Sequence, residues 1–311
     1  MAEFRHLGGH LSFRDFWAWR RDRMERQSVV TRLTVFSREH LSAGRPHYLA
    51  TFAHDGNSHV ISVFGRPEDW QMDTIFEFLS SHGLVFGSAL DIGANIGIHS
   101  LLFAQKYDRV VAFEPHPQTF RLLSVNLENY AQNAIALNIA LYSDSRRLVL
   151  ADARPGNIGA ASLHGSQDSA DGFEVVTRAL DEVAQLADLP IGLMKIDTEG
   201  TEYEVLLGAE SLIEKNKPVV VMEDFKSLSG RRSEAVRFLE GLGYDTFLEP
   251  AFFPTRRNKK GLLNRLHGAL DIWRRGHAFG LRDCDYLSPR GYDLLLALHK
   301  THAATAGICR T

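Results

Sequence analysis

Carboxylate side chains come directly after two apolar runs of the chain, at 191–196 and at 218–222. A carboxylate in such a place can accept a proton from a hydroxyl nucleophile, and several together can hold a divalent cation. Lys195 lies just before the first group, within its apolar run. The residues available for this chemistry are Asp197, Glu199, Glu202, Glu223 and Asp224.

A turn that contains two glycines is the second feature with chemical meaning. Gly93 and Gly97 lie four positions apart, with Asn95 between them and Asp91 within the preceding apolar run. A dinucleotide-binding loop has the spacing G-x-G-x-x-G, so this turn does not favour a pyrophosphate. Close backbone approach at the glycines would instead let a compact zwitterionic ligand lie across the strand end. Its carboxylate would face backbone N–H groups, and its ammonium would face Asp91.

Glu114 follows the next apolar run, 23 positions after Asp91. An acid at the carboxyl end of the second strand of an open α/β sheet is placed to accept protons from both ribose hydroxyls. The alternative is a solvated residue at a strand end, without a ligand. The nearby glycine turn favours the ribose role.

The elements that must position these residues alternate from about residue 85 onward. Short apolar runs alternate with helical patterns, which predicts βαβ units and a mostly parallel, doubly wound sheet. The runs are nearly continuously apolar, as expected for strands that helices cover on both faces. The predicted strands are 88–92, 109–113, 135–141, 191–196, 218–222 and 245–248, and the predicted helices are 96–105, 117–130, 201–215 and 233–242.

Two segments depart from this alternation. Residues 155–172 are rich in glycine and serine and have no clear period, so they form either a surface insertion or an active-site lid. They follow a further apolar run at 148–151. Before residue 85, the runs 48–53 and 59–64 flank the turn residues 55–57, which predicts a β-hairpin.

The motifs, taken in order, resemble those of a known family. Asp91-Ile-Gly-Ala-Asn-Ile-Gly97, Ala112-Phe-Glu-Pro115 and Lys195-Ile-Asp-Thr-Glu-Gly-Thr-Glu202 are similar to the motifs of the FkbM family of S-adenosylmethionine-dependent methyltransferases. The resemblance covers residues 85–250 and includes the small loop at 138–144. It implies a Rossmann-like class I methyltransferase fold that binds S-adenosyl-L-methionine.

The resemblance also implies which residues contact this cofactor. The loop 93–97 would touch its methionine part, Glu114 its ribose, and Ala140 with Leu141 the edge of its adenine. The expected cofactor-binding residues are Asp91, Gly93, Asn95, Gly97, Glu114, Ala140 and Leu141.

Three of the carboxylates become candidate catalytic residues in this context, because methyl transfer to a hydroxyl needs an aligned nucleophile and a proton acceptor. Asp197 is expected to face the reactive methyl or the acceptor, and Glu223 ends the neighbouring strand. Glu199 is either a general base or a cap for the following helix, whereas capping is favoured for Glu202. A divalent cation held by Asp197, Glu223 and Asp224 is an alternative that we do not favour.

The expected activity is O-methylation of a hydroxyl on a sugar, glycolipid or secondary metabolite. The sequence lacks the Asn/Asp-Pro-Pro-aromatic signature of planar-amine methylation, which favours a hydroxyl acceptor. One alternative is an RNA or protein methyltransferase that docks through basic segments. Another is a scaffold that binds S-adenosyl-L-methionine without catalysis.

Charge is distributed unevenly along the 311 residues, although the formal net charge is only −3. Residues 1–40 carry eight basic and five acidic side chains, and residues 251–311 carry eleven and four. The stretch between them holds 16 basic and 29 acidic side chains, and this acidity would repel a phosphate backbone. Nucleic acid is therefore disfavoured as a partner of the middle part.

We expect three parts: an N-terminal extension with a helix and a hairpin (1–84), a methyltransferase domain (85–250) and a basic, helical C-terminal extension (251–311). In the last part, apolar residues at helical spacing over 262–273 predict an amphipathic helix. This helix either packs against the domain or contacts an anionic membrane, glycan or lipid. The aromatic and arginine residues of 13–23 predict a docking helix or partner contact.

The cellular compartment follows from what the sequence lacks. Its two cysteines, Cys284 and Cys309, are too few for a disulfide framework or a structural zinc site. No apolar run approaches the roughly 20 residues of a transmembrane helix, and the first residues lack the apolar segment of a secretion signal. We therefore expect a cytoplasmic protein.

Overall fold

The computed structural model of the chain describes residues 31–34, 49–52, 69–151, 172–224, 232–253, 278–284, 292–305 and 307. Contacts divide the chain into two units, Met1–Gly65 and Arg66–Thr311. In the first unit, β1 (Thr31–Thr34) pairs antiparallel with β2 (Leu49–Phe52). β2 lies in the first run of the predicted hairpin, but its partner is β1, and the second run at 59–64 is outside the described residues.

Eight strands form the central sheet of the second unit: β3 (Ser88–Ile92), β4 (Arg109–Phe113), β5 (Ala134–Leu137), β9 (Ile191–Ile196), β10 (Val219–Asp224), β11 (Tyr244–Phe253), β12 (Ala278–Asp283) and β13 (Tyr292–His299). Their order is β12-β11-β13-β10-β9-β3-β4-β5. The five strands from β10 to β5 are parallel, whereas β13 runs antiparallel to both of its neighbours and β12 runs antiparallel to β11. The predicted parallel sheet is confirmed, and the carboxyl ends of its parallel strands share one edge.

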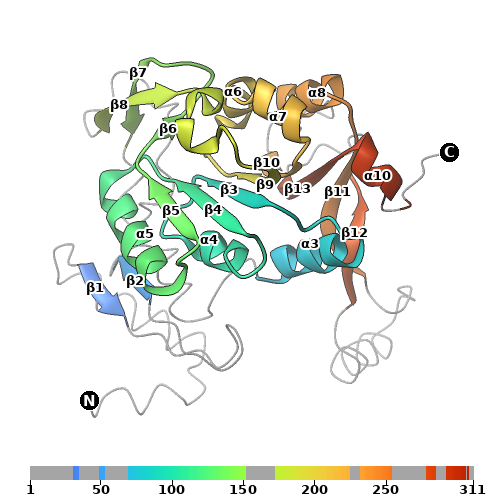
Figure 1. Cartoon of the computed structure of the whole chain (residues 1–311), viewed down its shortest axis with the longest axis horizontal. Helices are drawn as coiled ribbons and strands as arrows, with labels where there is room; N and C mark the ends of the chain where they lie inside the picture. The colour runs from blue at the N-terminus through green and yellow to red at the C-terminus, as the bar shows by residue number, and fades with distance from the viewer. Residues whose placement is uncertain are drawn as a thin grey trace, which may run out of the picture. The chain divides into compact units, whose positions relative to one another are not determined.

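Helices cover both faces of this sheet (Figure 1). On one face lie α3 (Asp69–Ser81), α4 (Ile98–Phe103) and α5 (Pro117–Tyr130), and on the other lie α6 (Glu202–Leu207), α7 (Glu210–Asn216) and α8 (Glu234–Gly241). Two short 3-10 helices, η3 (Leu180–Glu182) and η4 (Ala184–Leu186), precede β9, and α10 (Lys300–Thr305) follows β13. None of the helices in the described part of the chain is long and apolar enough to cross a bilayer.

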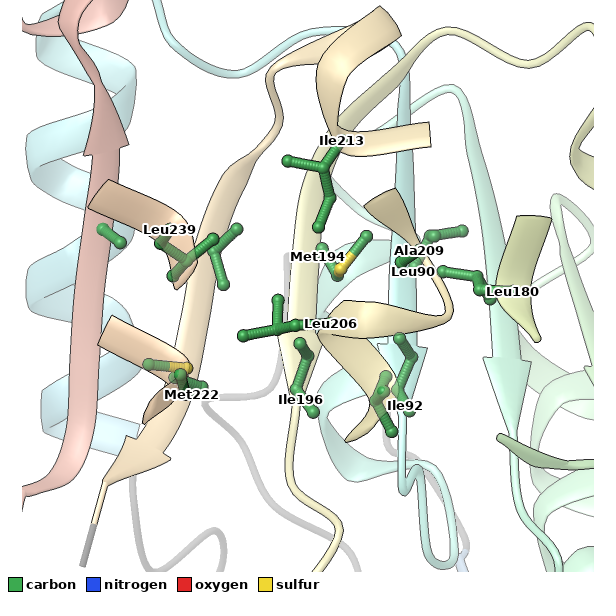
Figure 2. Close-up of a cluster of buried hydrophobic side chains, with 14 of the residues drawn as sticks. Leu90, Ile92, Leu180, Met194, Ile196, Leu206, Ala209, Ile213, Met222 and Leu239 are labelled. Carbon is green, nitrogen blue, oxygen red and sulfur yellow. The ribbon is translucent and has the colours of Figure 1, made fainter. Parts of the chain in front are cut away.

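Successive side chains of β9 point to opposite faces of the sheet, so this strand packs against both helix layers. Met194 and Ile196 are fully buried and pack with Leu206 of α6, as Figure 2 shows. Leu193 points to the opposite layer, where it packs with the side chains of α3 and α4. Because both faces exclude water, the strand is apolar almost throughout, and Lys195 is its charged exception.

Two elements that we predicted as continuous are each interrupted in the structure. The strand is interrupted at a hydrogen-bonded asparagine, and the helix at a glycine packed against backbone. The strand predicted at 135–141 ends with β5, and β6 (Ala140–Leu141) instead joins β8 (Gly172–Arg178) and β7 (Arg147–Ala151) in a three-stranded sheet. Asn138 lies between them and donates to the carbonyls of residues 114 and 115. The helix predicted at 201–215 breaks at Gly208, where a Cβ would lie 2.1 Å from the Tyr142 carbonyl oxygen.

The C-terminal part differs from the helical extension that we expected at 251–311. Two of its segments, β12 and β13, are strands of the central sheet, and β13 lies between β10 and β11. The strand predicted at 245–248 is the longer β11. The predicted helices at 262–273 and 13–23 lie outside the described residues.

Candidate active site

The carboxyl ends of four parallel strands, β3, β4, β9 and β10, bring the predicted site residues to one edge of the sheet. Asp91 lies in β3, and Gly93, Asn95 and Gly97 lie in the loop that follows it. Four further residues belong to the next three strand ends: Glu114 after β4, Asp197 and Glu199 after β9, and Glu223 within β10, whereas Ala140 and Leu141 lie in β6 of the smaller sheet. This edge is where ligands collect in open α/β sheets.

Gly93 is required by a close approach between two protein loops. Its φ is +77°, and a Cβ there would lie 1.8 Å from the Asp197 carbonyl oxygen. The N–H groups of Gly93 and Ala94 both donate to the Phe113 carbonyl, at 3.0 and 2.9 Å. The sequence suggested close approach to a ligand at this glycine, whereas in the structure Gly93 fixes the β3 loop against the end of β9.

The rest of the loop is held by its neighbours in a similar way. Asn95 has a φ of 50°, in the left-handed region that asparagine tolerates, and its N–H donates to Glu114 Oε2 at 2.9 Å. Gly97 begins α4 with a φ of 92°, where a Cβ would lie 2.7 Å from a methyl carbon of Leu123. The Asn126 amide donates to the Ile96 carbonyl at 2.7 Å. The shape of the loop is therefore fixed by contacts within the protein.

Glu114 presents a buried carboxylate that is already oriented. Oε2 accepts from the Asn95 N–H, and Oε1 accepts from the His116 N–H at 2.9 Å. Burial raises the pKa of Glu114 to about 7, although these two hydrogen bonds oppose the shift and the charges of Asp91 and Asp197 add to it. Each oxygen keeps a further lone pair with which it can accept a hydroxyl proton.

Asp91 is completely buried beneath the loop. Its Oδ2 accepts from the Ser100 hydroxyl at 2.5 Å, and Lys195 Nζ lies 3.9 Å from Oδ1, which has no hydrogen-bond partner. Burial raises the pKa of Asp91, while Lys195 and Ser100 lower it. Direct contact between Asp91 and a ligand stays a prediction, and the burial of its side chain disfavours it.

Around the ends of β9 and β10 the charges are mostly negative. Asp197 is partly exposed, and its Oδ2 lies 2.9 Å from Lys195 Nζ. The pKa of Glu223 is raised to about 9, first by burial and then by the charges of Asp197 and Glu199. Burial and the charges of Asp197 and Glu202 likewise raise the pKa of Glu199, although Glu199 itself is exposed.

Glu202 begins α6, but its hydrogen bonds hold the turn before this helix, and the capping role that we predicted for it stays a prediction. Its Oε1 accepts from the N–H and hydroxyl of Thr198, at 3.3 and 3.2 Å, and from the Gly200 N–H at 2.9 Å. These bonds hold the turn that carries Glu199 at a φ of 54°. Glu199 is thereby presented at the surface of the turn, and its role as a base stays a prediction.

Two residues that organise the site, Ser100 and Asn126, were given no role by sequence reasoning. Ser100 binds Asp91, and Asn126 holds the β3 loop. Both are fully buried polar residues, a pattern that marks a hydrogen-bonded position but names no partner. Asn138, an exposed residue of the predicted loop 138–144, ties the β5 end to residues 114 and 115 through hydrogen bonds of 2.7 and 2.9 Å. Ala140 and Leu141 are buried in β6, and their contact with adenine stays a prediction.

The alternative of a cation site at Asp197, Glu223 and Asp224 finds no support in the geometry. Among the residues that the structure describes, no three or more His, Cys, Asp or Glu side chains form a group that could hold a metal ion.

The sheet and the position of the site define the class of protein. A mostly parallel sheet covered by helices on both faces, with the site at the carboxyl ends of its central strands, is the Rossmann-like class I methyltransferase fold. Residues 91–246, about half of the chain, match the model of the methyltransferase FkbM domain. The chain belongs to the FkbM methyltransferase family.

Two curated proteins that the chain resembles are named as methyltransferases. The chain is 32% identical over 133 residues to the hexuronic acid methyltransferase AglP of Haloferax volcanii, covering 42% of this chain and 53% of that one. It is 30% identical over 189 residues to the methyltransferase sdnD of Sordaria araneosa, covering 50% and 73%. The chain thus spans about half the length of the H. volcanii relative.

A solved structure, an FkbM methyltransferase from Methylobacillus flagellatus KT, is similar with a TM-score of 0.39 and 17% identity. The match covers 68% of this chain and 43% of that one.

Proposed function

We propose that the chain transfers a methyl group from S-adenosyl-L-methionine to a hydroxyl oxygen of a sugar, glycolipid or secondary metabolite. The observation that carries this proposal is the Glu114 carboxylate, held by the N–H groups of Asn95 and His116 beside the β3 loop. Two oriented acceptor oxygens at this edge suit a ribose diol. Membership of the FkbM methyltransferase family supports the methyl donor.

The residues present fit this cofactor. In the proposal, Glu114 accepts the two ribose hydroxyls with its remaining lone pairs, and the loop 93–97 borders the methionine part. Ala140 and Leu141 supply an apolar edge for adenine. Asp91 acts indirectly, because its buried carboxylate is already engaged by Ser100. Bound S-adenosyl-L-methionine would supply an electrophilic methyl group on a positively charged sulfur.

The carboxylates of β9 and β10 would prepare the acceptor. A hydroxyl must lose its proton as its oxygen attacks, so the site needs a proton acceptor near the attacking atom. We assign this role to Glu223, because burial and neighbouring negative charge make its carboxylate a stronger base than an ordinary glutamate. Asp197, oriented by Lys195, would align the acceptor through a hydrogen bond.

The acceptor class is drawn from chemistry and from one relative. The H. volcanii relative is named a hexuronic acid methyltransferase, which supports a sugar hydroxyl as the acceptor. Basic segments near both ends remain candidates for contact with a charged glycan or an anionic membrane, and they lie largely outside the described residues.

Calorimetry with two nucleotide ligands tests the cofactor assignment. We expect the chain to bind S-adenosylhomocysteine, the product form of the cofactor, and not NAD, because the β3 loop lacks the dinucleotide spacing. Binding of NAD alone would overturn the assignment.

Incubation with cofactor labelled on the methyl group identifies the acceptor. A cell extract treated with the protein is fractionated into lipid, glycan, nucleic-acid, protein and small-metabolite pools. Label in the glycan, lipid or metabolite pool supports the proposal, whereas label confined to nucleic acid or protein would contradict it. An Asp197→Asn, Glu223→Gln double variant is the control, and it should transfer no label if these carboxylates are catalytic.

A further inference from the structure

Lys195 is an unusual residue for the middle of a parallel sheet. Its side chain is 1% exposed, and lysine is almost never buried to this extent unless it is paired. It lies opposite Asp91 in the pairing of β9 with β3, and opposite Val221 in the pairing with β10. On its own strand, Leu193 on the same face packs in an apolar cluster. Packing alone would therefore be satisfied by an apolar residue at this position.

The ammonium of Lys195 joins two carboxylates that belong to different parts of the site. Nζ lies 2.9 Å from Asp197 Oδ2 and 3.9 Å from Asp91 Oδ1. Asp91 in turn accepts from Ser100, a residue of α4. The connected side chains thus run from the first helix after the β3 loop, through β3 and β9, to the acidic turn that follows β9.

Stability is a weak reason for such an arrangement. Removing a lysine and an aspartate from water costs free energy that their attraction repays only in part, and apolar residues of similar volume often stabilise a core more. A buried charge at the edge of a site instead changes the charge and orientation of its neighbours. Lys195 pairs with Val221 of β10, two positions before Glu223, and its charge lowers the pKa of Glu223 and of Glu199 while the surrounding carboxylates raise both.

We propose that Lys195 is a positioning residue of this site, which holds the Asp197 carboxylate in one orientation and keeps the carboxylate of Glu223 available in a crowd of negative charge. This role rests on the proposed function, since it supposes that Asp197 and Glu223 receive the acceptor. Lys195 itself is almost completely buried, so we expect it to act through these carboxylates. Without its charge, Glu223 would hold its proton to a higher pH, and Asp197 would lose its partner.

Carboxyl ¹³C NMR of the ligand-free protein measures the first of these effects. The protein is labelled at glutamate Cδ and titrated with pH, and the Glu223 signal is assigned by its absence in Glu223→Gln. In Lys195→Met, which keeps a side chain of similar length without charge, we expect the Glu223 midpoint to rise by about one pH unit. Lys195 pairs with Val221, two positions before Glu223 in β10, and its positive charge favours the ionised carboxylate. Lys215→Met, which removes an exposed lysine on α7, should leave the Glu223 midpoint unchanged.

A second variant keeps the test valid if Lys195→Met leaves Asp91 buried without a counter-charge and unfolds. In Asp91→Asn, Lys195→Met both charges are removed, and the Glu223 midpoint should rise as in the single variant. Asp91→Asn alone should shift the midpoint much less, because Asp91 lies on β3 and β9 separates it from β10.

An unchanged Glu223 midpoint in the folded variants would overturn the proposal. Failure of both Lys195 variants to fold would overturn it too, since Lys195 would then serve stability. The NMR titration uses no ligand, so its result is independent of the calorimetry with S-adenosylhomocysteine that tests the proposed function.

Discussion

Glu223 differs from an ordinary glutamate in the charge that surrounds it. Burial and the charges of Asp197, Glu199 and Glu202 raise its pKa to about 9, so at neutral pH most molecules carry a proton on this carboxyl. Only the deprotonated form can act as a base. The rate of methyl transfer should therefore increase at alkaline pH.

We expect kcat/KM with the acceptor found by labelling to rise by about tenfold per pH unit up to pH 9 and then to level off, as the carboxylate form of Glu223 accumulates. Glu223→Gln should lower the rate by about 10²–10⁴-fold and remove this slope, because the amide cannot take a proton. Glu210→Gln, an exposed residue of α7, is the control. A slope that persists in Glu223→Gln would assign the base to another residue.

Glu114 must be deprotonated to accept hydrogen bonds from both ribose hydroxyls. Its pKa is raised to about 7, so its carboxyl is neutral below that pH and charged above it. A charged carboxylate accepts from two hydroxyls, whereas the protonated acid has one oxygen that donates. Affinity for S-adenosylhomocysteine should therefore weaken as the pH falls through 7.

Calorimetry between pH 5.5 and 8.5 measures this dependence. We expect Glu114→Gln to lose about 10–100-fold in affinity at pH 8, the value of a hydrogen bond to a charged group, and to show no dependence on pH near 7. Glu128→Gln on the exposed side of α5 should bind like the unchanged protein. Equal affinity of Glu114→Gln and the unchanged protein would remove Glu114 from the cofactor site.

At the scale of elements, the shape of the β3 loop depends on a single residue, Gly93. Gly93→Ala would place a Cβ 1.8 Å from the Asp197 carbonyl oxygen and would also force alanine to a φ of +77°. A backbone atom cannot move aside as the end of a side chain can. We expect a loss of about 3 kcal/mol or more in the free energy of unfolding in urea, together with weaker binding of S-adenosylhomocysteine.

Gly83→Ala is the control that separates the cost of a left-handed backbone from the cost of a steric clash. Gly83 has a φ of +67°, but nothing lies within 4 Å of its added Cβ, so only the cost of the left-handed conformation, about 1–2 kcal/mol, should appear. Similar losses in the two variants would show that the contact between the β3 loop and the end of β9 is not tight.

Sequence patterns predicted some elements closely and missed others for physical reasons. The strands at 88–92, 109–113 and 191–196 agree with the structure in their bounds, because a run buried on both faces is apolar throughout and ends where polar residues begin. Gly208 could not be recognised as a helix break, because the reason for it is the Tyr142 carbonyl, 66 positions away in the sequence.

In the candidate site, too, local sequence patterns predicted some features, whereas others depend on tertiary contacts. The common location of Glu114, Asp197 and Glu223 could be predicted because the carboxyl ends of parallel strands share one edge of a sheet, and the strands follow from local patterns. The central place of Lys195 was not found, because it depends on the pairing of β9 with β3 and on the burial of Asp91. A lysine next to carboxylates in sequence gives no sign of which of them it contacts.

For the molecule as a whole, the structure differs most from the sequence-based expectation in the C-terminal boundary of the methyltransferase domain. The expected boundary at residue 250 would divide β11, which continues to Phe253, and would leave β12 and β13 outside. Antiparallel β13 lies between β10 and β11, so it shields the edge of β10 next to Glu223. The apolar run at 294–298 is visible in the sequence, but its place between two earlier strands is set by tertiary pairing.

A chain that ends at residue 250 should therefore fail to fold cooperatively. It would lose Leu294, Leu295, Leu296 and Leu298, each at most 4% exposed. Burial of one such side chain contributes about 1.5–3 kcal/mol, so the four together approach the whole stability of a typical domain, about 5–15 kcal/mol. A chain that begins at Arg66 keeps the second unit and should unfold cooperatively in urea and bind S-adenosylhomocysteine. If the chain ending at residue 250 did both, β12 and β13 would be an accessory to the methyltransferase fold of this protein and not a part of it.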